Sequence, residues 1–116
     1  MVIAFDYDGT ITKDEHAFLV TIMMFILRKH TVLIVTQRSE EQGDDVKKFV
    51  DKIDLEHPEE ATIIWSSGKA KQVAAIEAGH FVDVWVEDNP ISIFEPLVYV
   101  GEGGNAAKSE ETREDS

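Results

Sequence analysis

The sequence predicts an α/β protein, a three-layer α/β/α sandwich around a parallel, Rossmann-like sheet of about five strands. Two observations lead to this fold class. First, apolar strand-like segments alternate along the chain with segments of helical periodicity. Second, the strand-like segments are continuous apolar runs, which is typical of strands buried on both faces of a parallel sheet. Ligands of such sheets bind beyond the carboxyl ends of the strands, so we look for a site there.

Five segments have the composition of strands. Each is short, apolar and rich in β-branched or aromatic residues, and most end in polar or turn-forming residues. They are residues 2–5, 31–35, 61–65, 82–86 and 97–100.

Three helices are expected between these strands. They cover residues 14–29, 39–53 and 69–78. Asp14 and Ser39 have the residue types that cap helix N-termini, so we expect the first two helices to begin there. In the third helix, the spacing predicts that Val73 and Ile76 face inward.

The chain length and the charge limit what the protein can be. Its 116 residues suffice for one domain. The sequence has 23 acidic and 11 basic residues, a formal net charge of −12, which disfavours binding to nucleic acids. It has no cysteine, which excludes disulfides, thiolate metal sites and a cysteine nucleophile. Residues 101–116 carry five acidic and two basic residues and no large apolar one, and predict a flexible acidic tail.

The hydropathy of the chain gives no sign of a membrane segment. Its longest apolar stretch, residues 17–27, has 11 residues, whereas a helix needs about 20 to span a bilayer. Met1 leads directly into a strand-like run without the pattern of a signal peptide. We therefore expect a soluble, cytoplasmic protein.

Polar residues that can do chemistry follow the predicted strands. Carboxylates that gather at one edge of a sheet repel one another unless a hard cation holds them, and sites made of oxygen ligands favour Mg²⁺. Mg²⁺ in turn binds phosphate oxygens. The residues in question are Asp6, Asp8, Gly9 and Thr10 after the first strand, Thr36, Gln37 and Arg38 after the second, Lys69 and Lys71 after the third, and Glu87 and Asp88 after the fourth.

These residues resemble the motifs of a known family. The run Asp6-Tyr7-Asp8-Gly9-Thr10 resembles motif I of the haloacid-dehalogenase-like (HAD) phosphatase superfamily. Thr36 resembles motif II, the lysine at the start of the third helix motif III, and Glu87-Asp88 motif IV, all in the family's order. The resemblance implies a HAD-like catalytic domain over residues 1–100.

The intervals between these motifs bear on substrate access. Most members carry a cap domain inserted after motif I or between motifs II and III. Here 20 residues separate Thr10 from Thr31, and 24 separate Thr36 from Ala61. Each interval holds one helix and a loop, so we expect no cap domain and an open site.

The resemblance implies a Mg²⁺-dependent phosphomonoester hydrolase that acts through an aspartyl-phosphate. Asp6 would be the nucleophile and a metal ligand. Asp8 would be the acid and base, with its backbone carbonyl on the metal. Thr36 would hydrogen-bond the transferring phosphoryl group. Lys71 would neutralise charge near Asp6, and Lys69 is the alternative.

The remaining site residues follow from the same resemblance. Asp88 would complete the metal shell, and Glu87, longer than the Asp that many members carry there, would reach the metal through water. The substrate would be a small phosphorylated molecule in contact with Gly9, Thr10, Gln37 and Arg38. Arg38 could instead face solvent or pair with a glutamate.

Other functions and an oligomeric state are also consistent with the sequence. The chain could be a receiver-like signalling module that keeps an aspartyl-phosphate, or a catalytically idle HAD-like binding protein. The helix predicted over residues 14–29 is apolar nearly all the way round, more than one sheet face can cover. Because large exposed apolar patches mark contacts between molecules, a homodimer could form through this helix.

Overall fold

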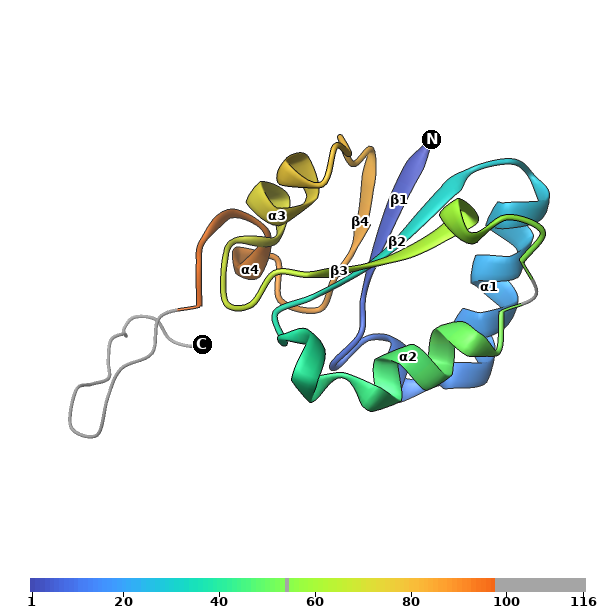
Figure 1. The fold of residues 1–116 in the computed structure, drawn as a ribbon, viewed down its shortest axis with the longest axis horizontal. Helices are drawn as coiled ribbons and strands as arrows, with labels where there is room; N and C mark the ends of the chain where they lie inside the picture. Colours follow the sequence, from blue (N-terminus) through green and yellow to red (C-terminus); the bar gives the residue numbers. More distant parts are fainter. Residues whose placement is uncertain (54, 98–116) are drawn as a thin grey trace.

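One parallel sheet forms the centre of the molecule. The computed structural model describes residues 1–53 and 55–97 (Figure 1). Its four strands lie in the order β3-β2-β1-β4, and every neighbouring pair is parallel. The strands are β1 (Val2–Asp6), β2 (Thr31–Thr36), β3 (Ala61–Trp65) and β4 (Val84–Val86). This arrangement confirms the predicted α/β class with a parallel, Rossmann-like sheet.

The described part of the chain contains one strand fewer than the sequence suggests. Leu97, the first residue of the predicted fifth strand, is in no strand, and its N–H donates to the carbonyl of Gly68 at 2.6 Å. The other residues of that strand, 98–100, lie outside the described residues, as does the predicted tail over residues 101–116.

The helices follow the strands in the predicted alternation. They are α1 (Glu15–Leu27), α2 (Asp44–Asp51), α3 (Lys71–Glu77) and α4 (Ile91–Phe94). Short 3-10 turns cover Ile11–Lys13, Glu40–Gln42 and Pro58–Glu60. Asp14 caps α1 as predicted, because its carboxylate accepts the N–H of Ala17 at 3.1 Å.

The second helix begins later than predicted. Ser39 starts only a 3-10 turn, in which its N–H donates to the side chain of Gln42 at 3.1 Å. Gly43 then separates this turn from α2. The indole of Trp65 packs so closely against Gly43 that any side chain there would collide with the ring. The continuous helix predicted from Ser39 is therefore wrong.

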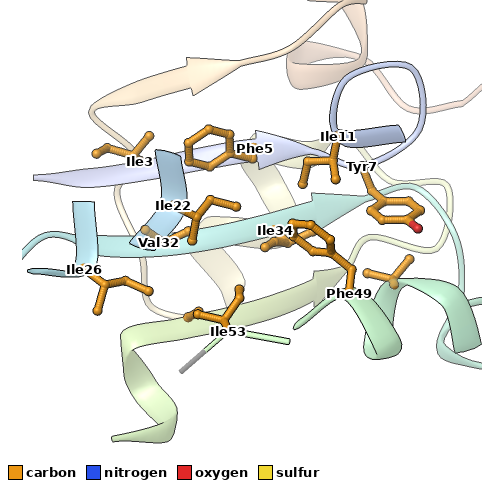
Figure 2. Packing of buried hydrophobic residues seen from close by; sticks show 12 residues of the cluster. Ile3, Phe5, Tyr7, Ile11, Ile22, Ile26, Val32, Ile34, Phe49 and Ile53 are labelled. Carbon is orange, nitrogen blue, oxygen red and sulfur yellow. The ribbon is translucent and has the colours of Figure 1, made fainter. Parts of the chain in front are cut away.

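The two faces of the sheet carry hydrophobic cores of different size. The larger core joins β1 and β2 to α1 and α2 (Figure 2). Its fully or nearly fully buried members are Ile3, Phe5, Tyr7, Ile11, Ile22, Ile26, Val32, Ile34, Val46, Phe49, Ile53 and Ala61. The smaller core alternates with it along the same strands and receives α3. Its buried members are Ala4, Leu33, Val35, Ile64 and Ala74.

Helix α3 presents a different face to the sheet from the one the sequence suggests. Its buried residues are Lys71, Ala74 and Ala75, at the i, i+3, i+4 spacing of one helix face. Val73 and Ile76 are nearly half exposed, so the prediction that they face inward is wrong. The small alanines allow the helix to approach the strands, and this orientation places the ammonium of Lys71 in the interior.

Helix α1 is apolar on its outer side as well as its inner side. Val20, Met24 and Leu27 are exposed, whereas Met23 packs against the larger core. A homodimer through this helix stays a prediction. Among the described residues, no helix combines the length and the hydrophobicity that crossing a membrane requires.

Candidate active site at the carboxyl edge of the sheet

The strand register brings the predicted site residues to one edge of the sheet. Asp6, the last residue of β1, lies opposite Val35, one residue before the end of β2. Thr36 ends β2 and lies opposite Trp65, the end of β3. Strand β4 ends opposite Phe5, so Glu87 and Asp88 leave the sheet beside Asp6.

Asp6 is buried and held by two donors. One oxygen accepts from the ammonium of Lys71 at 2.6 Å, and the other from the hydroxyl of Thr10 at 3.2 Å. The same ammonium lies 2.6 Å from a carboxylate oxygen of Glu87. The side chains of Asp6, Lys71 and Glu87 are 6%, 4% and 3% exposed. One buried cation thus bridges two buried carboxylates.

A third carboxylate completes an acidic group that can hold a metal ion. Asp6, Glu87 and Asp88 each offer one oxygen, and these oxygens lie within 4.8 Å of one another. Three carboxylates against the single charge of Lys71 leave two net negative charges, which a divalent cation would neutralise. The donors are all oxygens, the ligand type that hard cations prefer.

The protonation of Asp6 reflects the same crowding. Burial, followed by the hydrogen bond with Asp88, raises the pKa of Asp6 to about 7, although Lys71 opposes the shift. That hydrogen bond lowers the pKa of Asp88. Without a cation, therefore, Asp6 carries the proton of the pair at mildly acidic pH.

Gly9 allows Asp88 to approach the end of β1. Its φ is +81°, which favours glycine, and a Cβ at this position would collide with the Asp88 carboxylate. The N–H of Gly9, expected to contact substrate, donates to the hydroxyl of Thr12 at 2.9 Å. The sequence reasoning missed Thr12, although hydroxyl side chains often bond the backbone a few residues away.

Asp8 belongs to a second, exposed cluster. Both of its oxygens accept hydrogen bonds from Arg38, from Nε at 2.9 Å and from Nη2 at 2.6 Å. Nη1 of Arg38 donates to Asp45 at 2.6 Å and to the carbonyl of Gln42 at 2.8 Å. The structure therefore does not bring the Asp8 carboxylate into the group of Asp6, Glu87 and Asp88. Asp45 and Gln42 were missed by the sequence reasoning.

The other predicted residues are placed as follows. Thr36 is buried, and its hydroxyl accepts the N–H of Arg38 at 3.3 Å. Gln37 is half-buried, and its carbonyl accepts the N–H of Gly68 at 3.0 Å. The Lys69 side chain is exposed and pairs with Glu77 at 2.8 Å on the surface.

Ser66 is a further polar residue at this edge that the sequence reasoning did not single out. It follows β3 directly and is buried. Within the described part of the chain, its hydroxyl has no hydrogen-bond partner. Its position after a strand was the available signal, because the other polar groups at this edge also follow strands.

Comparison with known proteins supplies no relative for this arrangement. The chain matches no protein-family model, no curated protein and no solved structure. The choice of a function therefore depends on the chemistry that the described residues can perform.

Proposed function

We propose that the protein is a Mg²⁺-dependent phosphomonoester hydrolase of the HAD-like kind, with Asp6 as its nucleophile. One observation carries the proposal. Asp6 ends a central strand as a buried carboxylate, with Lys71 on one oxygen and two further carboxylates at hand to hold a cation. This combination suits phosphoryl transfer, which depends on positioning and on the neutralisation of charge.

The first step transfers the phosphoryl group to the protein. A carboxylate oxygen of Asp6 forms a bond to phosphorus while the bond from phosphorus to the ester oxygen breaks. The leaving oxygen takes a proton from Asp8. Lys71 keeps the attacking oxygen oriented and offsets the negative charge that accumulates. Thr36, buried at the end of β2 and next in sequence to Val35, the register partner of Asp6, would hydrogen-bond the phosphoryl oxygens.

The second step returns the protein to its starting state. A water oxygen forms a bond to phosphorus, its proton goes to the Asp8 carboxylate, and the bond from phosphorus to Asp6 breaks. Inorganic phosphate leaves, and the Asp6 carboxylate is regenerated. The proton that Asp8 accepts here replaces the one it gave in the first step.

The acidic group would supply the ligands of the cation. Asp6 and Asp88 offer oxygens directly, and Glu87, already bonded to Lys71, would act through water. The backbone carbonyl of Asp8 would be a further ligand. When bound, Mg²⁺ would neutralise charge on the carboxylates and on the phosphoryl oxygens. Its preference for phosphate makes it the cation we propose.

The finer fold and the substrate belong to the same proposal. We place the chain among three-layer α/β/α sandwiches without a cap domain. In the described region, the interval between β1 and β2 is built around α1, and the interval between β2 and β3 is built around α2, so neither contains a further domain. An open site would accept a small phosphorylated substrate, with Thr10 and Gln37 near its phosphate.

Turnover of an aryl phosphate tests the function. The full chain should release phosphate with Mg²⁺ present and lose this activity after treatment with EDTA. Asp6→Asn should retain the fold, measured by circular dichroism, and should show no turnover, because an amide does not attack phosphorus. A wild-type protein that keeps a stable phosphoryl group on Asp6 would instead be a receiver-like module. If no phosphoryl transfer is detected, the result would support the alternative of a catalytically idle binding protein.

A further inference from the structure

The guanidinium of Arg38 already makes several hydrogen bonds to other residues of the protein. It follows β2, and its side chain is 25% exposed. Its guanidinium donates two hydrogen bonds to Asp8, one to Asp45 and one to the carbonyl of Gln42. It also lies over the ring of Tyr7, 5.4 Å from the ring centroid. Four of the five N–H groups of the guanidinium are therefore engaged without any ligand.

The hydrogen bonds of Arg38 divide its guanidinium into an anchored part and a part that holds Asp8. Asp45 and Gln42 hold Nη1 from the side of α2, while Nε and Nη2 form a fork that meets both oxygens of Asp8. The Asp8 side chain is 55% exposed and would otherwise sample several rotamers. Because a guanidinium is planar, its two parallel bonds fix the plane of the carboxylate as well as its position.

We infer that Arg38 is a positioning residue for Asp8 in the second step of the proposed reaction. It holds the carboxylate so that the lone pairs left free by the fork can accept the proton of the attacking water. Each carboxylate oxygen has two acceptor positions, so two bonds from Arg38 leave room for that water. This inference rests on the proposed function and gives Arg38 a task other than binding the substrate phosphate.

Pre-steady-state kinetics with an aryl phosphate test the inference. An aryl leaving group departs without a proton, so with this substrate only the second step needs Asp8. Arg38→Ala should still release one aryl product per site in a rapid burst and then turn over slowly. We expect kcat to fall about 10- to 100-fold, the effect of a misplaced catalytic group. KM should fall in parallel, leaving kcat/KM nearly unchanged, because kcat/KM reports only the steps up to phosphorylation of Asp6.

Two more variants separate position from charge and from folding. Arg38→Lys keeps the cation and most of the length but has no planar fork, so it should show the same burst and the same slow turnover as Arg38→Ala. Asp45→Asn weakens the anchor of Arg38 and leaves the bond to the Gln42 carbonyl, so its kcat should fall less. Lys52→Ala is the matched control, because it removes a surface cation paired with Glu15 at 3.4 Å far from Asp8 in sequence.

The possible outcomes are distinct. A burst followed by slow turnover in both Arg38 variants supports the inference. A raised KM with unchanged kcat would overturn it and make Arg38 a substrate-binding residue. Full restoration of kcat in Arg38→Lys would also overturn it, because charge alone would then suffice. If the wild-type protein shows neither a burst nor turnover, the proposed function is wrong, and this inference fails with it.

Discussion

Two charged clusters of similar arrangement lie near the carboxyl edge of the sheet, and they differ strongly in their exposure to water. In each, one cation bridges two carboxylates through contacts of 2.6 Å. The side chains of the Lys71 cluster, which contains Asp6 and Glu87, are 3–6% exposed. Those of the Arg38 cluster, which contains Asp8 and Asp45, are 25–55% exposed.

This difference in burial changes what each cluster contributes. Water can replace a lost partner in the exposed cluster, so each pair there contributes about 0–1 kcal/mol to stability. It cannot do so in the buried cluster, where the removal of Lys71 leaves Asp6 and Glu87 without a cation, at a cost of about 3–5 kcal/mol. The charge of Lys71 thus contributes to stability as well as to the proposed chemistry, whereas the exposed cluster can position a side chain with little effect on stability.

The largest expected effect is the loss of the buried cation. Lys71→Met should lower the free energy of unfolding at neutral pH by about 3–5 kcal/mol and should abolish phosphate release. The loss of stability should shrink at about pH 5, because the pKa of Asp6 is raised to about 7 and this carboxylate can take up a proton there. Urea denaturation at both pH values measures this.

The matched substitution on the surface is Lys69→Met. It removes an exposed pair with Glu77 and should cost less than about 1 kcal/mol. Equal losses of stability in the two variants would contradict the comparison of burial. Loss of phosphate release in Lys69→Met alone would show that Lys69 is the lysine of the active site.

The second expected effect is a pH dependence of the melting temperature, on which bound Mg²⁺ should act in the opposite sense. The pKa of Asp6 is raised from 3.8 to about 7, so the folded state holds a proton that the unfolded state gives up. The stabilising contribution of this proton is complete below about pH 4 and is lost as the pH rises through about 7. The melting temperature of the metal-free protein should therefore fall across this window because of Asp6.

Mg²⁺ should act in the opposite sense, because it binds the ionised carboxylate. The rise in melting temperature that Mg²⁺ produces should be small at about pH 5 and should grow through about pH 7. Asp6→Asn is the control, and in this variant the Asp6 contribution to the pH dependence should disappear. An equal effect of Mg²⁺ at both ends of the window would show that Asp6 is not a ligand.

Sequence patterns predicted the part of the site that depends on strand ends. β1 and β2 were predicted to within one residue, because each is a continuous apolar run that stops at a polar side chain. A parallel sheet then brings those ends together whatever else the chain does. This is why Asp6, Thr36 and Asp88 could be assigned to one edge from the sequence.

The rotation of α3 and the partners of Arg38 could not be predicted in the same way. Apolarity alone would turn Val73 and Ile76 inward, but the helix is turned so that Lys71 reaches Asp6 and alanines meet the strands. Arg38 pairs with an aspartate 30 residues away in the sequence. With 23 acidic residues in the chain, no local pattern selects that partner.

The smallest expected effect is the response of the two clusters to salt, and it separates them most directly. Double-mutant cycles measure the coupling energy of a pair apart from the other effects of each substitution. For Asp8 and Arg38 we expect about 1 kcal/mol or less in dilute buffer. This value should fall towards zero in about 1 M NaCl, where charges are screened beyond about 3 Å. For Asp6 and Lys71, the coupling should be larger and should change little with salt, because dissolved salt screens a contact between side chains that are 4–6% exposed far less than a contact on the surface. A strong response of the buried pair to salt would show that water reaches Asp6, and the case for its raised pKa would then fail.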